Sequence, residues 1–174
     1  MGTGIQICGL NGSGKSTLGK ALAERTGFHF IDNENLYFPQ MNHQDAYKAP
    51  QSREEVEKLL AKEISLYPDY VFAAVKGDYA KGMIPAYDYV IWIEVPKSIR
   101  LQRVRNRSFL KFGSRMLPGG DLYEQEEAFF RMVDSRPDDY VEAWLRTLPC
   151  PVIRVDGTKS IDDNVEFIIR SIGI

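Results

Sequence analysis

Residues 9–17 read Gly-Leu-Asn-Gly-Ser-Gly-Lys-Ser-Thr, a glycine-rich stretch that fits the pattern G-x-x-x-x-G-K-[ST] in full. An apolar run from Ile5 to Cys8 precedes this stretch, and apolar residues at helical spacing follow it until Gly27. Glycine adopts backbone conformations that other residues avoid, so the chain can turn sharply between the two elements. The stretch therefore predicts a strand, a tight loop and a helix whose N-terminus faces the loop.

A loop of this kind is suited to holding phosphate groups. Successive backbone N–H groups turn inward around phosphate oxygens, and the N-terminus of the following helix adds a fixed positive partial charge. We expect Lys15 to reach the β- and γ-phosphates and the Ser16 hydroxyl to bind Mg²⁺, with Thr17 as a neighbouring phosphate donor, as in similar loops. The predicted nucleotide-binding residues are Gly9, Asn11, Gly12, Ser13, Gly14, Lys15, Ser16 and Thr17. ATP and Mg²⁺ are the expected cofactors, and a turn that merely joins strand to helix is the alternative.

The rest of the chain alternates strand-like and helix-like segments. Continuous apolar runs at 70–75 and 89–95 are typical of strands covered on both faces, and shorter runs lie at 28–32 and 151–155. Helical spacing is expected at 52–67, 96–108, 122–134, 138–148 and 161–172, with an irregular segment at 33–51 and a mobile one near 113–120. This alternation predicts an α/β fold: a three-layer, doubly wound parallel sheet forming a single domain over residues 1–174.

Composition excludes several classes of protein. Lysine and arginine total 22 against 24 acidic residues, a net charge of −2, which disfavours a nucleic-acid partner. No apolar run approaches the roughly 20 residues of a membrane helix, so no membrane partner is expected. Because the first residues lack a basic and apolar leader, we expect a cytoplasmic location. Cys8 and Cys150 are expected to be small core residues without chemistry.

The motif, the order of elements and the chain length together resemble the small P-loop kinases, the group that contains the adenylate, shikimate and gluconate kinases. The resemblance covers nearly the whole chain and implies transfer of phosphate from ATP to a small-molecule acceptor, with an acceptor-binding region at about 33–67 and a lid at about 103–121. Two alternatives stay open. One is a nucleoside or nucleoside-monophosphate kinase, and the other is an ATP-binding or ATP-hydrolysing regulatory module.

The resemblance also implies an acidic residue at the end of the second strand. Asp32 and Glu34 occupy that place, where a carboxylate can take the proton of an attacking hydroxyl or bind the acceptor. The alternative for Asp32 is a cap on the following turn. After the third strand, Asp78 is expected to bind the acceptor, to hold Mg²⁺ through water, or to be a turn residue. Lys76 and Arg53 are expected to bind an acidic substrate or to be solvated charges.

A basic run is the expected lid. Residues 100–115 contain Arg100, Arg103, Arg105, Arg107, Lys111 and Arg115 and no acid. Arg103 and Arg107 share a helix face and match the R-x-x-x-R spacing with which similar lids contact adenine and the transferring phosphates, so both are candidate catalytic and nucleotide-binding residues. A solvated basic face is the alternative, and RNA binding is disfavoured by the acidic total.

Three further features follow the expected lid. Arg136 is a weaker candidate for a returning lid arginine. Asp156, Gly157 and Thr158 follow the last strand and resemble the loop that lines the adenine pocket, with an ordinary turn as the alternative. Glu124, Glu126 and Glu127 are expected to form a solvated helix face. The oligomeric state is not predicted by the sequence.

Overall fold

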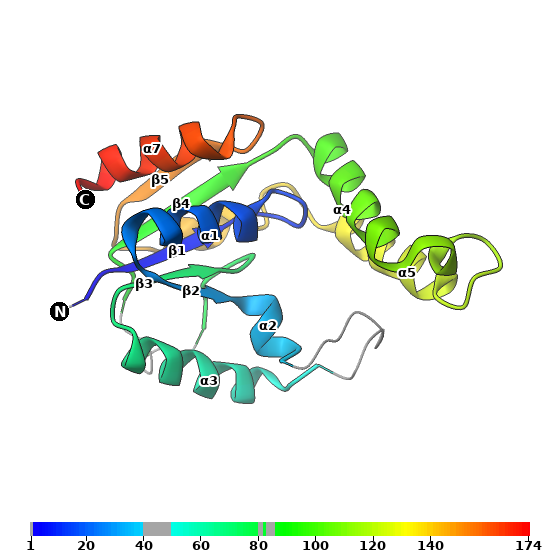
Figure 1. The fold of residues 1–174 in the computed structure, drawn as a ribbon, viewed down its shortest axis with the longest axis horizontal. Helices are drawn as coiled ribbons and strands as arrows, with labels where there is room; N and C mark the ends of the chain where they lie inside the picture. The colour runs from blue at the N-terminus through cyan, green and yellow to red at the C-terminus, as the bar shows by residue number, and fades with distance from the viewer. Residues whose placement is uncertain (1, 40–49, 80–81, 83–85) are drawn as a thin grey trace.

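The computed structural model describes residues 2–39, 50–79, 82 and 86–174. Within these residues a five-stranded parallel sheet has the order β2-β3-β1-β4-β5. The strands are β1 (Gly4–Cys8), β2 (His29–Asp32), β3 (Tyr70–Ala73), β4 (Tyr89–Glu94) and β5 (Val152–Asp156). Helices cover both faces (Figure 1), so the doubly wound α/β prediction is confirmed.

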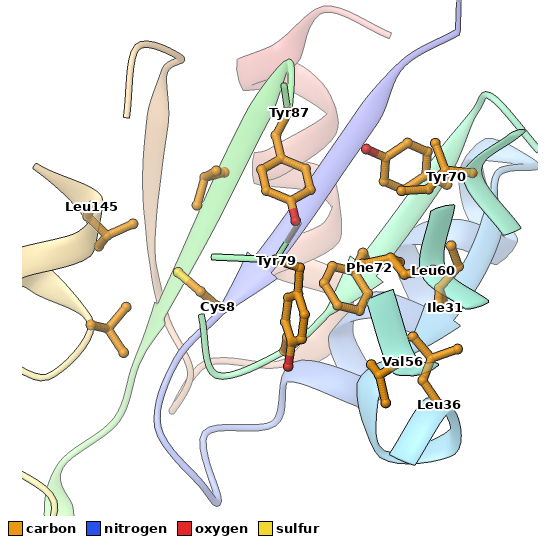
Figure 2. Packing of buried hydrophobic residues seen from close by; sticks show 14 of the residues in the cluster. Cys8, Ile31, Leu36, Val56, Leu60, Tyr70, Phe72, Tyr79, Tyr87 and Leu145 are labelled. Carbon is orange, nitrogen blue, oxygen red and sulfur yellow. The ribbon is translucent and has the colours of Figure 1, made fainter. Parts of the chain in front are cut away.

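Alternate residues of each strand belong to different cores, as the two-residue period of a strand requires. On one face Ile5, Ile7 and Ile91 pack with helices α1 (Lys15–Thr26) and α7 (Ile161–Ile172). On the other face Phe72 and Val90 pack with α3 (Arg53–Leu66), α2 (Asn33–Tyr37) and α6 (Glu142–Leu145), as Figure 2 shows for the part nearest α3. Burial on both faces explains why these strands read as continuous apolar runs.

Two helices that follow β4 in the chain, α4 and α5, form an arm that extends beyond the sheet (Figure 1). Helix α4 (Lys97–Phe112), the 3-10 helix η1 (Gly113–Met116) and α5 (Tyr123–Ser135) share an apolar cluster built on Val104, Phe112 and Phe130. Near 113–120, where a mobile segment was expected, the chain forms η1, and Arg115 pairs with Asp121 at 2.7 Å. The predicted lid is therefore a helical hairpin with its own small core.

Acids of α5 neutralise part of the basic run. Arg105 pairs with Glu127 at 2.9 Å, and Lys97 pairs with Asp134 at 3.0 Å. The prediction of a solvated acidic face is thus wrong for Glu127, and it is wrong for Glu126 as well, which is fully buried. Charges that are separated along the sequence meet because α4 and α5 pack against each other.

Three segment boundaries differ from the sequence predictions. A short helix, α2, begins directly after Asp32, where an irregular segment was expected, because the Asp32 side chain caps it. Helix α4 continues to Phe112, four residues beyond the predicted end, and Gly113 then ends it with a positive φ of 56°. The helix expected at 138–148 is reduced to Glu142–Leu145, flanked by turns. The expected irregular and acceptor-binding segments include residues 40–49, which lie outside the described residues.

Two other expectations concern cysteines and membranes. Cys8 and Cys150 are free thiols, and burial raises the pKa of Cys8 to about 12, so its thiol stays protonated and unreactive. Across the part of the chain that the structure describes, no helix combines the length and the apolar character needed to cross a bilayer.

The capping box at the start of α3 gives a stability prediction. The Ser52 hydroxyl accepts a hydrogen bond from the Glu55 backbone N–H at 3.2 Å, and the Glu55 carboxylate accepts one from the Ser52 N–H at 2.8 Å. Replacing Ser52 with alanine should lower the free energy of unfolding by about 1 kcal/mol, measured by urea denaturation. Ser171→Ala is the control, because its hydroxyl only donates to the Phe167 carbonyl within an exposed turn of α7. Equal losses in both variants would contradict the capping role.

Candidate active site

The loop between β1 and α1 leaves backbone donors open at its inner side. Helix α1 begins after Gly14, which has no side chain to cap the first turn, and its first residues are Lys15, Ser16 and Thr17. The first N–H groups of a helix have no partner within the helix, so they are free to bind an anion. Gly12 and Gly14 have φ values of 81° and 94°, which the tight turn requires and which disfavour other residues. The loop therefore has the backbone geometry of a phosphate cradle.

Lys15 lies at the centre of this cradle. Its Nζ donates to the Leu10 carbonyl oxygen at 3.2 Å, so the ammonium is folded back over the loop. Burial lowers the pKa of Lys15 from 10.5 to about 8, the neighbouring Arg107 charge lowers it as well, and the Asp32 carboxylate opposes the shift. A buried ammonium with an incomplete set of partners favours the approach of an anion.

A cavity of about 250 Å³ opens beside Lys15 and brings predicted residues from four separate segments together. The P-loop contributes Asn11, Gly12, Lys15 and Ser16, the end of β2 contributes Asp32, α2 contributes Glu34, and α4 contributes Arg107. The remaining lining residues are Asn33, Tyr37, Phe38, Ala73, Ala74, Val75 and Phe129. Phosphate-binding groups and carboxylates thus face the same small space.

Asp32 caps α2 and also lines the cavity. One carboxylate oxygen, Oδ1, accepts a hydrogen bond from the Glu34 backbone N–H at 3.0 Å and so caps α2. The residue also lines the cavity that contains Lys15. The cap holds the carboxyl group in place by one oxygen, and a carboxylate has further lone pairs with which to accept a proton or a hydrogen bond.

Arg103 and Arg107, the two arginines predicted for the lid, lie near the loop in different ways. Arg103 donates to the carbonyl oxygens of Gly157 and Gly12, at 3.1 Å and 3.5 Å, and so joins the P-loop to the turn after β5. Arg107, one helical turn further, lines the cavity. In the turn after β5 the Asp156 carboxylate accepts hydrogen bonds from Thr158, which hold the pKa of Asp156 below its usual range. The Asp156 side chain therefore shapes this turn.

Arg53, Lys76 and Asp78 form a cluster of their own outside this lining. The Asp78 carboxylate lies 3.7 Å from the Lys76 ammonium and 3.8 Å from the Arg53 guanidinium. Arg53 also pairs with Glu57 at 3.1 Å, and hydrogen bonding to Glu57 together with the Asp78 charge raises its pKa. Asp78 is not among the residues that line the cavity with Ser16. Mutual neutralisation explains this arrangement of the three charges.

Two further side chains lie at the site: Arg136, which was a weaker candidate, and Phe129, which was not predicted. Arg136 donates to the side-chain oxygen of Asn11 at 2.7 Å and lies over the Tyr140 ring at 5.3 Å, which supports its weaker assignment as a returning arginine. Phe129 lines the cavity from α5, while its neighbour Phe130 is buried in the core of the arm. The sequence offers two adjacent phenylalanines and nothing that separates their roles.

Comparison with protein families identifies the family to which the chain belongs. The family model AAA_18, an AAA domain, matches residues 5–109, and the chain belongs to this family. Among curated proteins it is 28% identical over 173 residues to the uncharacterized protein YqaC of Bacillus subtilis (strain 168), which covers 95% of this chain and 94% of that protein. It is also 28% identical to a shikimate kinase of Thermosynechococcus vestitus, covering 86% of this chain and 91% of the relative.

Solved structures share the fold. A gluconokinase from Sinorhizobium meliloti 1021 superposes with a TM-score of 0.53 and 18% identity, covering 94% of this chain and 87% of that one. A deoxyadenosine kinase from M. mycoides, with bound dATP, superposes with a TM-score of 0.59 and 13% identity, covering 99% of this chain and 100% of that one. The expectation of a small P-loop kinase is confirmed.

The buried ammonium gives a pH prediction. A triphosphate binds the protonated form of Lys15, which predominates below a pKa of about 8 and is lost above it. The affinity for ATP should therefore fall as pH rises through 8, approaching a decrease of about tenfold per pH unit. Isothermal titration with a non-hydrolysable ATP analogue between pH 7 and 10 measures this slope.

Lys15→Arg is the matched control for the pH slope. Arginine keeps its charge throughout this range, so this variant should bind more weakly but with an affinity that does not change with pH. An equal slope in the wild type and in Lys15→Arg would exclude Lys15 as the titrating group.

Proposed function

We propose that this protein transfers the γ-phosphoryl group of ATP to a hydroxyl group of a small-molecule acceptor. The observation that carries the proposal is the cavity in which Lys15, Ser16, Arg107 and Asp32 meet. Phosphoryl transfer depends chiefly on positioning and on stabilising negative charge. Cations on one side of the cavity and a carboxylate on the other match those two needs.

The P-loop is suited to the nucleotide phosphates. The uncapped start of α1 supplies N–H groups, and Lys15 supplies a positive charge that is already desolvated. Arg103 lies between the P-loop and the turn after β5, a position from which its guanidinium can contact the nucleotide base. Arg107 would meet the charge that spreads over the γ-phosphoryl oxygens, for which a planar guanidinium with several donors is well suited.

The donor set also fits Mg²⁺, which prefers oxygen ligands and commonly keeps several waters. Ser16 lines the cavity and would offer its hydroxyl to the ion, whereas Asp78 would have to release Lys76 and Arg53 to contribute. When bound, Mg²⁺ neutralises charge on the phosphate oxygens.

Asp32 would act at the acceptor. A hydroxyl hydrogen-bonded to its carboxylate is oriented toward the γ-phosphorus, and the carboxylate takes the proton as the new O–P bond forms. The bond between the γ-phosphorus and the β,γ-bridging oxygen breaks, and ADP leaves with that oxygen. Glu34, at the same end of the cavity, would accept a hydrogen bond from a second acceptor hydroxyl.

The aromatic lining favours an acceptor with an apolar face. Tyr37, Phe38 and Phe129 line the cavity beside the two carboxylates. Aromatic rings pack against the C–H face of a sugar ring or stack on a base. These rings make a nucleoside kinase the second candidate function. A deoxyadenosine kinase that shares the fold agrees with this second candidate.

An acceptor screen tests the proposal. The protein is incubated with γ-labelled ATP, Mg²⁺ and pools of sugars, hydroxy acids, nucleosides and nucleotides, including shikimate, gluconate and deoxyadenosine. We expect label in a phosphorylated metabolite, and Lys15→Ala should abolish its appearance while the fold is retained. Arg105→Met is the matched control, because Arg105 pairs with Glu127 away from the cavity. Label that appears solely as free phosphate would indicate an ATP-hydrolysing regulatory module and contradict the proposal.

Asp32→Asn separates acceptor activation from folding. Asparagine caps a helix as well as aspartate does, so α2 should stay intact. Because the amide cannot take a proton, kcat with the acceptor found in the screen should fall by about 100-fold or more, while ATP affinity changes by less than about threefold. Asp162→Asn, in the first turn of α7, is the control. A kcat within twofold of the wild type would remove Asp32 from the mechanism.

A further inference from the structure

Arg100 is a buried arginine at the base of the arm, although the sequence groups it with the lid. It ends the first turn of α4 and is 4% exposed. Burying a guanidinium is costly unless its donors are paired. Its Nε donates to the Val95 carbonyl oxygen at 3.1 Å, and one terminal nitrogen donates to the Asp138 carboxylate at 3.1 Å. The other terminal nitrogen lies 3.5 Å from the Asn11 backbone carbonyl oxygen.

The contact with Asn11 fixes one peptide group of the P-loop. In a trans peptide the carbonyl and the following N–H point in opposite directions. The described peptides are all trans, so the Gly12 N–H points away from Arg100. The Asn11 side chain is held as well, by the guanidinium of Arg136 at 2.7 Å. Two arginines thus determine how Asn11 sits in the loop.

The backbone of α4 supports the same peptide. A Cβ added to Gly12 would lie 2.3 Å from the Arg100 carbonyl oxygen, so the helix and the loop are in direct contact at this point. Three residues further along α4, Arg103 lies 3.5 Å from the Gly12 carbonyl oxygen. The orientation of the Asn11–Gly12 and Gly12–Ser13 peptides is therefore tied to helix α4.

We infer that Arg100 is a positioning residue that orients the Asn11–Gly12 peptide so that the Gly12 N–H is directed to the nucleotide phosphates. The inference rests on the proposed function, because it assigns a role in nucleotide binding at the P-loop. A peptide group held in its binding orientation before the ligand arrives loses less conformational freedom on binding. Arg100 also makes the base of α4 part of the P-loop, so the position of the lid arginines and the shape of the cradle are coupled.

Substitution of Arg100 separates positioning from folding. We expect Arg100→Met to weaken binding of a non-hydrolysable ATP analogue with Mg²⁺ by about tenfold, measured by isothermal titration. Arg100→Lys keeps the charge and much of the stem, but its donors all leave one nitrogen and cannot reach the three separate acceptors of the guanidinium, so a loss of affinity of about threefold is expected. Arg105→Met, an arginine of the same helix, should stay within about twofold of the wild type.

A second readout reports the peptide itself. In ¹H–¹⁵N spectra the Gly12 amide signal of the wild type should shift on addition of the ATP analogue, since its N–H gains a charged acceptor. In folded Arg100→Met and Arg100→Lys this shift should be smaller. A merely structural role would lower the free energy of unfolding and leave both the affinity of the folded protein and this shift unchanged.

The outcomes distinguish the inference from the proposed function. If the wild type binds no ATP analogue, the proposed function fails and the inference fails with it. If the wild type binds and folded Arg100→Met shows the same affinity and the same Gly12 shift, the inference alone is overturned. Should Arg100→Met fail to fold, Arg100→Lys decides: wild-type affinity and an unchanged Gly12 shift overturn the inference, and losses in both support it.

Discussion

The need to leave backbone N–H groups unpaired at the start of α1 governs the arrangement of this protein. The helix begins after Gly14, and its first turn faces the cavity without a side-chain cap. β1 lies between β3 and β4. The connection that follows β1 therefore runs to β2 on one side of the sheet, and the connection that follows β3 crosses to β4 on the other side. Ligands of open parallel sheets bind at such a point, outside the carboxyl ends of the strands. The position of the loop therefore places the cavity.

Neighbouring elements bring complementary charges to that position. β2 ends at Asp32, whose cap on α2 places a carboxylate in the cavity, and α4 presents Arg107 from the other side. The net charge of −2 conceals a basic run and an acidic helix that neutralise each other in part where α4 and α5 pack. What is left for the nucleotide is a small set of cations with defined orientations.

Most of the fold was predictable because each strand and helix carries its own signal. The P-loop motif and the alternation of apolar runs with helical spacing are local features, and the structure confirms them. Contacts between distant segments were not predictable. Arg100 and Arg107 look alike in the sequence, yet one is buried behind the loop and the other lines the cavity. Likewise the sequence places Asp78 after the third strand but does not indicate its ion pairs with Lys76 and Arg53.

The most direct test of the account is a crystal structure of the protein with ADP, Mg²⁺ and aluminium fluoride, a planar mimic of the transferring phosphoryl group. The account predicts ADP phosphates in the P-loop and the fluoride between Lys15, Arg107 and Asp32, within hydrogen-bonding distance of the two cations. Nucleotide bound elsewhere, or a fluoride facing a surface without Asp32, would contradict the claim that this cavity is where phosphate is transferred.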